Sequence, residues 1–457
     1  MAQLAAIVLA AGQGTRMCSR RAKVLHKVCG KPMVSHVVDS LRLAGVTKII
    51  VVIGHQGEKV KEAMGAGVEF VWQEERLGTG HAVGMAKDIF VGHEGHVMVL
   101  AGDTPLLRPQ TLKELAAVGR GFSAAVLTAR MPDPGGYGRV IRGADGTIVG
   151  IVEERDASPA QLAMDEVNTG TYIFRSQDLF PALERIKPDN AQGEYYLTDV
   201  IGLLVREGKA VAGHGCREWQ EAMGINDRVQ LAFAEGVLRE RIRRELMLSG
   251  VTIYAPESVF IDMDVEVGQD TIIHPFCFLE GRTVVGEECV IGPGVRITDC
   301  ELGRGVEVQN AILVGSKIGD GVRIGPYAYL RPGNIIEERV KIGDFVEVKN
   351  SRVGSGSKVP HLTYVGDAII GEGVNIGAGV ITCNYDGRQK HQTIIEDDVF
   401  VGSNANLIAP VTIRQGAYVA AGSTITKDVP SEGLGIARAR QDNREGWARK
   451  RKERADK

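Results

Sequence analysis

Residues 317–348 read KIGDGVRIGPYAYLRPGNIIEERVKIGDFVEV and carry one aliphatic side chain at every sixth position. The repeat passes without a break through Ile318, Ile324, Leu330, Ile336, Ile342 and Val348. Glycine follows several of these aliphatics, as in Ile318–Gly319, and it lets a chain turn a tight corner at little steric cost. One inward-pointing aliphatic per six residues, stacked from coil to coil, predicts a left-handed parallel β-helix of triangular section.

The same period extends over much of residues 250–457. One further run comprises Val267, Ile273, Leu279, Val285, Ile291 and Ile297, and another comprises Ile395, Val401, Leu407, Ile413, Val419 and Ile425. The register is lost for longer between Ile376 and Ile395, where residues 382–392 read TCNYDGRQKHQ. Because these residues are mostly polar, we expect them to leave the prism as a loop.

The first half follows a different pattern, in which short apolar runs alternate with helix-like segments. We predict buried strands over 5–10 (AAIVLA), 48–53 (KIIVVI) and 97–100 (VMVL), and helices over 33–43 and 111–118. This alternation favours an α/β Rossmann-like domain with a parallel sheet covered on both faces. Ligands of such folds bind at the carboxyl ends of the strands, where a glycine-rich loop and Gly102–Asp103 are found.

One helical stretch separates the two patterns. Val229, Phe233, Leu238, Ile242 and Leu246 recur in it at helical spacing, and Gly250 ends it. We therefore predict a first domain over 1–228, a linker helix over 229–249, and a β-helix domain over 250–457 that ends in a basic tail.

Composition narrows the class of protein. The 457 residues carry a net charge of −3, which argues against a general nucleic-acid binder. No apolar run approaches the ~18 residues of a membrane span, and we expect no membrane association and no secretory leader. The seven cysteines form no CxxC pair, and no histidine lies near them at the spacing of a metal site. This pattern is typical of reduced thiols in a cytoplasmic protein.

The first predicted strand runs into a glycine-rich loop, LAAGQGTRM at residues 9–17, with Lys23 beyond it. Backbone N–H groups of such a loop can hold phosphate oxygens, and Arg16 and Lys23 add the positive charge that a triphosphate needs. The loop is neither GxxxxGK[ST] nor GxGxxG, because Met17 stands where a third glycine would be. The alternative is an ordinary strand–helix turn, but the glycines together with both cations favour phosphate binding.

This loop, together with QEERLGTGHA at residues 73–82, resembles the sugar-nucleotidyltransferase family. Further matches occur in order along the chain: GYGRV at 136–140, IVEE at 151–154, VNTG at 167–170, GEYYLTD at 193–199, GINDR at 224–228, HLTYVGD at 361–367, NIGAG at 375–379 and CNYDG at 383–387. The whole chain is therefore similar to the bacterial bifunctional N-acetylglucosamine-1-phosphate uridyltransferases / glucosamine-1-phosphate N-acetyltransferases, which serve cell-envelope polysaccharide synthesis.

The resemblance implies a UTP and UDP-sugar site in the first domain. It places there Leu9, Ala10, Ala11, Gly12, Lys23, Gln73, Gly78, Thr79, Ala101, Gly102, Asp103, Gly138, Glu153, Asn168 and Asn226, with Gln73 reading uracil. Arg16 and Lys23 would stabilise charge in uridylyl transfer, and Asp103 and Asn226 would ligate Mg²⁺, which prefers oxygen ligands. A turn role for Asp103 is the alternative. The chain has Ala22 and Ala101 where the family usually has proline and an aromatic residue.

A second implied site lies on the β-helix, where His361 would be the general base of acetyl transfer, a role that suits histidine near neutral pH. Glucosamine 1-phosphate would be held by Arg331, Lys349, Tyr364, Asn375 and Lys390. Acetyl-CoA would lie along Ala378, Asn384, Tyr385, Ser403, Ala421 and Arg438. Pro360 replaces the small residue that usually precedes the base, which restricts the backbone there.

The implied function is a bifunctional enzyme that acetylates glucosamine 1-phosphate and then transfers UMP from UTP to the product. One alternative is a single-activity nucleotidyltransferase whose β-helix serves only for oligomerisation. Another is transfer of a different base, because Gln73 cannot exclude thymine. Hexapeptide acyltransferases of this kind place CoA between adjacent prisms, so the resemblance also implies a homotrimer.

Overall fold

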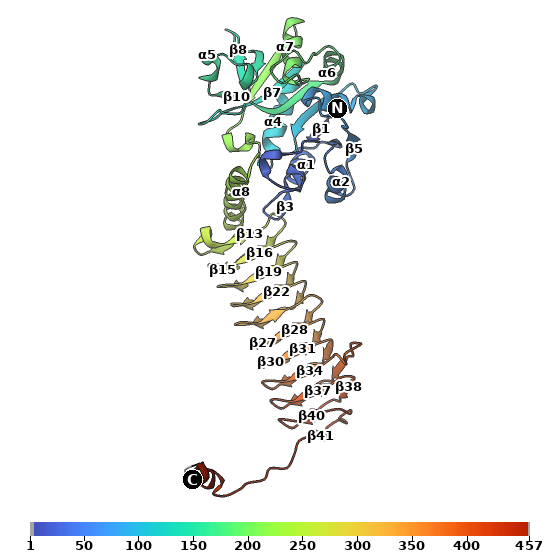
Figure 1. Cartoon of the computed structure of the whole chain (residues 1–457), viewed down its shortest axis with the longest axis vertical. Coiled ribbons are helices and arrows are strands. Elements are labelled where there is room, and N and C mark those ends of the chain that lie inside the picture. The colour runs from blue at the N-terminus through green and yellow to red at the C-terminus, as the bar shows by residue number, and fades with distance from the viewer. Residues whose placement is uncertain (1–3, 456–457) are drawn as a thin grey trace. The chain divides into compact units, whose positions relative to one another are not determined.

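The computed structural model describes residues 4–455. They form two compact units, one ending at Arg241 and the other beginning at Ile242, so the division falls within the helix α8 (Arg228–Leu248). In Figure 1 the blue and green half is α/β, whereas the yellow to red half consists of short strands in coils. A division inside a helix does not decide where either functional domain ends, and the limits at 228 and 250 stay predictions.

The first unit is built on a sheet of order β11-β7-β10-β6-β1-β4-β5, with the β8–β9 hairpin attached to β10. Its strands are β1 (Leu4–Ala10), β4 (Lys48–Ile53), β5 (Glu69–Trp72), β6 (His96–Ala101), β7 (Ala124–Arg130), β8 (Arg139–Arg142), β9 (Ile148–Val152), β10 (Glu166–Arg175) and β11 (Val211–Gly215). Parallel pairing of β1 with β4 and β6 confirms the three predicted strands. The sheet is nevertheless mixed, because the chain returns from the hairpin as β10, antiparallel to β6 and β7.

Helices cover both faces of this sheet, as the buried strands predicted. They are α1 (Met33–Leu43), α2 (Gly57–Met64), α3 (Thr79–Gly84), α4 (Pro109–Gly119), α5 (Pro159–Leu162), α6 (Ser176–Leu183) and α7 (Thr198–Arg206). Neighbouring residues of β1 belong to opposite cores: Ile7 packs in the cluster that includes Leu179 of α6, and Val8 in the one that includes Leu112 of α4. Shorter elements are η1 (Thr15–Met17), η2 (Lys23–Leu25), β2 (Lys27–Val28), β3 (Lys31–Pro32), η3 (Lys87–Phe90), η4 (Glu154–Asp156) and η5 (Trp219–Ala222).

The second unit is a prism of three parallel sheets. The first sheet contains β12 (Thr252–Ile253), β15 (Ile272–Ile273), β18 (Val290–Ile291), β21 (Glu307–Val308), β24 (Arg323–Ile324), β27 (Lys341–Asp344), β30 (Lys358–His361), β33 (Asn375–Ile376), β36 (Phe400–Val401), β39 (Tyr418–Val419) and β41 (Leu434–Gly435). The second contains β13 (Phe260–Ile261), β16 (Phe278–Glu280), β19 (Arg296–Thr298), β22 (Ile312–Val314), β25 (Tyr329–Leu330), β28 (Glu347–Lys349), β31 (Tyr364–Gly366), β34 (Ile381–Cys383), β37 (Asn406–Ile408) and β40 (Thr424–Ile425). The third contains β14 (Glu266–Val267), β17 (Val284–Val285), β20 (Glu301–Leu302), β23 (Lys317–Ile318), β26 (Ile335–Ile336), β29 (Arg352–Val353), β32 (Ala368–Ile370), β35 (Thr393–Ile395) and β38 (Val411–Ile413).

The six-residue period is confirmed by what lies inside the prism. Ile318, Ile324 and Leu330 are all buried, and each falls on a different sheet before the period returns to the first one. Successive coils then stack like on like, as Ile324 on Ile342. The predicted departure from the prism is also observed, because β34 ends at Cys383 and β35 begins at Thr393.

The apolar stripe predicted for the linker helix is only partly correct. Val229 is 80% exposed and Phe233 is 43% exposed, whereas Ala234, Leu238 and Ile242 are buried. The Phe233 ring instead stacks on Trp219 of η5, with 5.8 Å between ring centroids. Aromatic stacking at the edge of the first unit therefore takes the place of burial at the start of this helix.

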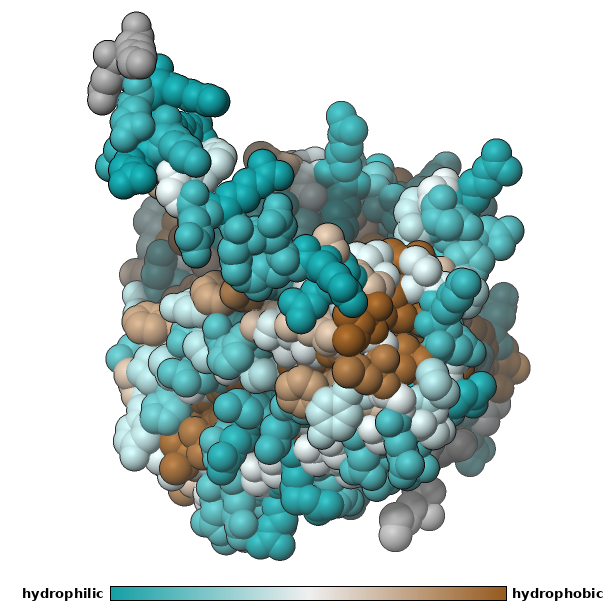
Figure 2. All heavy atoms as spheres, turned by 90° about the horizontal axis from the view of Figure 1, so that it is seen from below, coloured by the Kyte–Doolittle hydropathy of each residue, from teal (hydrophilic) through white to brown (hydrophobic). Residues whose placement is uncertain are grey.

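Among residues 4–455 no helix is both long enough and apolar enough to cross a bilayer. The face seen in Figure 2 is mostly hydrophilic, with apolar side chains gathered in a few patches. The basic tail carries α9 (Trp447–Ala455), whose side chains are exposed.

Candidate functional site

A cavity of about 280 Å³ opens at the carboxyl ends of β1 and β6. Parallel strands bring their ends to one edge of the sheet, so loops far apart in sequence meet there. Most of the residues predicted to bind the nucleotide line it: Leu9, Ala10, Ala11, Gly12, Lys23, Gln73, Gly78, Thr79, Ala101 and Asp103. Arg76 and Glu194 also line it; both belong to motifs quoted above but were not singled out.

The glycine-rich loop is shaped around Lys23. Gly14 has φ +69°, and a Cβ added to it would lie 2.4 Å from the Lys23 Cβ, so only glycine fits. The backbone amides of Gly12, Gln13 and Gly14 donate to no group in the described part of the chain. They are therefore available to an anionic ligand.

Ala22 stands where the family usually has proline, and hydrogen bonds hold the loop at this position. Its backbone N–H donates to the Gln56 side chain over 3.2 Å, a bond that proline could not make. The Gln56 amide also donates to the Arg20 carbonyl. Hydrogen bonds from a neighbouring loop thus replace the stiffness of a proline ring.

The Lys23 ammonium lies between the two predicted metal ligands. It donates to the Asp103 carboxylate and, over 3.1 Å, to the Asn226 amide oxygen, which comes from a loop 203 residues away in sequence. The described residues contain no cluster of three or more His, Cys, Asp or Glu side chains able to hold a metal. A carboxylate and an amide oxygen directed at one cation nevertheless fit Mg²⁺, which takes oxygen ligands and keeps several waters.

Gln73 is buried and its orientation is set by two acceptors. Its Nε2 donates to the Gly78 carbonyl over 3.2 Å and lies 3.0 Å from the His81 Nδ1. The donor half of the amide is therefore used within the protein. The oxygen half remains to accept a hydrogen bond from a ligand N–H.

A second cavity of about 210 Å³ shares Leu9, Thr79 and Ala101 with the first. It is lined by the predicted sugar-binding residues Gly138, Glu153 and Asn168, and also by Tyr137 and Thr198. Burial raises the pKa of the Glu153 carboxyl, although the Thr198 hydroxyl donates to it over 3.1 Å. The Asn168 amide donates to the Tyr172 hydroxyl over 2.7 Å, which fixes the amide in this wall.

Three predicted residues do not line either cavity. Gly102 lies just behind the wall, where its N–H donates to the Leu9 carbonyl over 2.9 Å. Asn226 is connected to the first cavity by its hydrogen bond with Lys23, which lines that cavity. Arg16 lies on η1 with its side chain exposed.

On the prism, His361 has a partner that the sequence analysis did not identify. Asp344 and His361 stand opposite each other on β27 and β30, and the Asp344 carboxylate is hydrogen-bonded to the imidazole Nδ1. This hydrogen bond lowers the pKa of Asp344. The available signal was spacing, since the two residues are 17 apart, the length of one coil. Pro360 does not disturb this register.

A group of positive charges lies along the second sheet of the prism and the loop after β34. Lys349 of β28 lies 3.5 Å from the Asp367 carboxylate, and it is close enough to Lys390 to lower the pKa of that ammonium. Arg331 is paired with Glu347 over 3.1 Å and also lowers the pKa of Lys390. Three cations against two carboxylates leave a net positive charge, which suits a phosphate.

The loop that carries Lys390 is a small hairpin. Tyr385 and Lys390 face each other across an antiparallel bridge, and the Asp386 carboxylate accepts from the backbone of Gln389 and Arg388 and from His391. These bonds, that of Gln389 foremost, lower the pKa of Asp386 to about 2. Asn384 at the base of the hairpin donates to Asp367, so the predicted residues Asn384 and Lys349 converge on one carboxylate.

The remaining predicted residues occupy a corner of the prism and its surroundings. The carbonyls of His361, Ala378 and Ser403 accept from the N–H groups of Gly379, Asn404 and Gly422 over 3.4, 2.7 and 2.8 Å. Ala378, Ser403 and Ala421 therefore follow one another down a single corner that starts at His361. The Tyr364 ring lies over Gly366, and Gly366 is the register partner of Lys349. Asn375 lies on β33 in the sheet of His361. Arg438 is exposed beyond β41, and no described contact joins it to this group.

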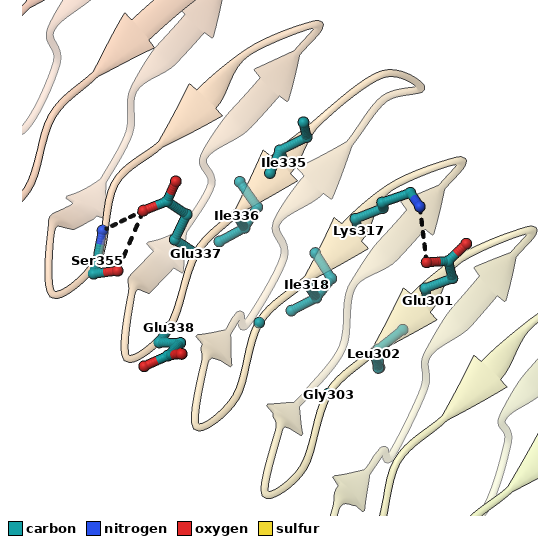
Figure 3. Close-up of a pocket in the computed structure, with 11 residues that line it drawn as sticks. Glu301, Leu302, Gly303, Lys317, Ile318, Ile335, Ile336, Glu337, Glu338 and Ser355 are labelled. Carbon is teal, nitrogen blue, oxygen red and sulfur yellow. Dashed lines mark hydrogen bonds and ion pairs between the residues drawn. The ribbon is translucent and has the colours of Figure 1, made fainter.

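An open groove of about 530 Å³ lies elsewhere on the prism, on the third sheet. Figure 3 shows Glu301 paired with Lys317 over 2.9 Å and Glu337 accepting from Ser355 over 3.2 Å. None of the predicted site residues is among the described residues that line it. Its charged groups are already paired, so the groove is not a candidate for either reaction.

Comparisons with known proteins match the first half of the chain and the prism to different families. Residues 6–200 match the MobA-like NTP transferase domain, residues 264–299 and 315–350 match the bacterial transferase hexapeptide family, and residues 392–427 match the hexapeptide repeat of succinyl-transferase. The chain is 52% identical to the bifunctional protein GlmU of Shouchella clausii over 97% of this chain and 98% of that one. It is 53% identical to GlmU of Heliobacterium modesticaldum over 97% of each chain. It is also 49% identical to GlmU of Listeria monocytogenes over 98% of this chain and 99% of that one.

Proposed function

The chain belongs to the family of bifunctional GlmU proteins, and from this premise we propose that its two units catalyse consecutive steps of UDP-N-acetylglucosamine synthesis. The prism transfers the acetyl group of acetyl-CoA to glucosamine 1-phosphate. The first unit then transfers UMP from UTP to N-acetylglucosamine 1-phosphate and releases pyrophosphate. The product serves cell-envelope polysaccharide synthesis. One observation carries the proposal: most residues predicted to bind the nucleotide and the sugar line two adjoining cavities of the first unit, and the predicted base His361 is hydrogen-bonded to a carboxylate.

In uridylyl transfer the nucleotide occupies the first cavity and the sugar the second. The loop amides from Gly12 to Gly14 and the Lys23 ammonium hold the phosphates, and the Gln73 carbonyl accepts from uracil N3–H. A phosphate oxygen of the sugar attacks the α-phosphorus, and the bond to the leaving pyrophosphate breaks in line. Little bond chemistry is left to the protein, so positioning and charge supply most of the catalysis.

Asp103 and Asn226 would hold Mg²⁺ in this reaction, and the ion would supply additional positive charge to the phosphates when bound. Support comes from the two oxygens that now face the Lys23 ammonium. If Asp103 and Asn226 held the ion, the Lys23 ammonium would be free to pair with phosphate oxygens of the nucleotide. Arg16, on the exposed turn, contributes charge at longer range.

In acetyl transfer His361 Nε2 takes a proton from the amine of glucosamine 1-phosphate. The nitrogen attacks the thioester carbonyl, the C–S bond breaks, and CoA leaves as a thiolate that is then protonated. Asp344 holds Nδ1 of the imidazole, which presents Nε2 to the substrate and stabilises the imidazolium that forms. Arg331, Lys349 and Lys390 hold the sugar phosphate, with Tyr364 and Asn375 beside it, and acetyl-CoA lies along Ala378, Ser403 and Ala421.

We also propose a homotrimer in which neighbouring prisms share the acetyl-transfer site. Phe276, Tyr327, Phe345 and Leu362 form a column at one corner, each with positive φ and each 57–67% exposed. A left-handed backbone costs a residue with a side chain roughly 1–2 kcal/mol, and glycine or asparagine occupies the position in other coils, as at Gly294 and Asn310. Large apolar side chains held there at a cost are explained by a neighbouring prism that covers them, and Leu362 places that neighbour beside His361.

The state of the thiols supports a proposal for the compartment. No disulfide joins any of the cysteines of the described chain, and burial raises the pKa of several of them, to about 12 for Cys216. Such thiols suit a reducing compartment, so we place the protein in the cytoplasm.

Two substitutions test the assignment of the reactions. Purified enzyme is given glucosamine 1-phosphate, acetyl-CoA and UTP, and CoA and pyrophosphate release are followed separately. His361→Ala should abolish acetyl transfer and leave uridylyl transfer from supplied N-acetylglucosamine 1-phosphate near the parent rate. Asp103→Ala should do the reverse. Loss of both activities in either folded variant would contradict the proposal, and intact uridylyl transfer with no acetyl transfer in the parent would favour a single-activity enzyme.

A further inference from the structure

Arg139, the first residue of β8, is buried to 2% exposure without a carboxylate partner among the described residues. Its guanidinium donates to two backbone carbonyls, those of Tyr137 and, over 3.3 Å, Leu162. Its Nε is buried and has no hydrogen-bond partner. Burying a charge in this way is costly, and a buried group that is not fully satisfied calls for a functional reason.

The two carbonyls belong to different segments of the sugar cavity. Tyr137 precedes Gly138, which lines the cavity, whereas Leu162 ends α5 in the segment that begins at Glu153. A second bond joins the same segments, because the Gly136 N–H donates to the Glu154 carboxylate over 2.7 Å. The β8–β9 hairpin joins these segments, with Arg139 opposite Val152. The bonds of Arg139 and Gly136 extend this connection beyond the strand ends, where Gly138 and Glu153 lie.

The distance between these segments matters to a ligand. A Cβ added to Gly138 would lie 3.3 Å from Glu153 Oε2, so the glycine backbone and the carboxylate form one continuous wall. The backbone N–H of Asn168 donates to the Gly138 carbonyl over 2.8 Å, so the position of Asn168 in the wall depends on that of Gly138. A small shift of either segment would therefore displace the wall residues that face the sugar.

We propose that Arg139 is a positioning residue for the sugar phosphate: it sets the spacing of Gly138 and Glu153 and thereby the affinity for the amino sugar, without touching it. This inference rests on the proposed uridylyl transfer. Because the wall lies in the second cavity, the nucleotide end of the first cavity is unaffected.

The test replaces Arg139 by methionine, which has a similar reach but no charge or donors. We expect the KM for N-acetylglucosamine 1-phosphate to rise by on the order of 10-fold, with the KM for UTP within about twofold of the parent. Loss of a costly buried charge should leave the thermal midpoint at or above that of the parent. Arg139→Lys keeps the charge and can reach one carbonyl, so its sugar KM should lie between those of Arg139→Met and the parent.

Arg142→Met is the matched control, since Arg142 lies on the same strand but pairs with Glu166 over 2.6 Å, outside both site cavities. It should leave both KM values unchanged. A lowered midpoint with unchanged sugar KM in Arg139→Met would show a structural role alone and overturn the inference, as would an equal rise in both KM values. If Arg139→Met does not fold, a parent-like sugar KM in Arg139→Lys has the same meaning. Failure of the proposed function would show separately, as absence of uridylyl transfer in the parent.

Discussion

The carboxylate of Asp344 is hydrogen-bonded to Nδ1 of His361, its register partner on the neighbouring strand. The bond leaves Nε2 as the nitrogen that can accept a proton and fixes the orientation of the ring. A lone exposed histidine would rotate freely, so the carboxylate turns a surface side chain into an oriented base.

Replacing Asp344 by asparagine should therefore slow acetyl transfer. Asparagine keeps the size of the side chain but does not stabilise an imidazolium, and we expect kcat to fall by about 10- to 100-fold. CoA release measured with a thiol reagent gives the rate. Uridylyl transfer in the same preparation is the control and should stay at the parent value. An unchanged kcat for acetyl transfer would show that the pair has no part in the reaction.

Glu153→Gln should stabilise the first unit while weakening sugar binding. Burial raises the pKa of Glu153, so its ionised form at neutral pH disfavours folding, and glutamine removes that cost. The thermal midpoint should rise by roughly 2–4 °C per kcal/mol gained, and the sugar KM should also rise.

The gain in stability should depend on pH in one direction. As the pH falls through the raised pKa of Glu153, the carboxyl becomes protonated in the folded protein, and the parent approaches the variant in stability. Thermal midpoints are compared at several pH values between neutral and mildly acidic. A gain that stays constant or grows as the pH falls would contradict the assignment of the cost to the ionised carboxylate.

Removal of divalent metal should separate the two reactions. With EDTA, uridylyl transfer should fall to background, because Asp103 and Asn226 are the oxygen ligands proposed for the ion. Acetyl transfer should continue, because the surroundings of His361 offer cations to the substrate and need no metal. Added Mg²⁺ should restore the first rate. Acetyl transfer that collapses with the chelator would contradict the assignment.

Gly14→Ala should impair uridylyl transfer through Lys23. The new methyl group would lie 2.4 Å from the Lys23 Cβ, and displacing this lysine should lower kcat/KM for UTP by about 10-fold or more. Gly92→Ala is the matched control, because Gly92 also has positive φ (+76°) but has open space around its Cβ position. Equal effects of the two changes would assign the loss to backbone strain alone.

Subunits with different defects should complement each other if the trimer shares its acetyl-transfer site. His361→Ala and Arg438→Ala subunits are mixed, denatured and refolded together. If the two residues come from opposite sides of one crevice, about one quarter of the sites in an equal mixture regain both, and acetyl transfer partly returns. If light scattering showed a monomer that had full acetyltransferase activity, the trimer would be contradicted. A trimer whose mixed subunits do not recover acetyl transfer would place both residues on the same side of the crevice.

Patterns that are local and periodic were readable without a structure. The six-residue aliphatic repeat alone specifies which side chains point inward, because every coil solves the same packing problem. The strand at 5–10 and the loop that follows it were equally readable, since a buried apolar run and a turn that needs glycine at Gly14 depend on a few adjacent residues.

The antiparallel course of β10 and the exposed start of α8 were not predicted, because both depend on neighbouring elements. The whole-chain resemblance implied which residues form each site, but it did not give their contacts with one another. Lys23 meets Asn226 across 203 residues, Asp344 meets His361 because one coil is 17 residues long there, and Arg139 is buried between two segments that sequence alone leaves apart. Hydropathy and residue spacing were enough to predict both architectures, because the pattern of buried residues that distinguishes each fold repeats along the chain. Which polar groups pair was decided only by the tertiary structure, because a charge is stabilised by whatever partner the fold brings within hydrogen-bonding distance.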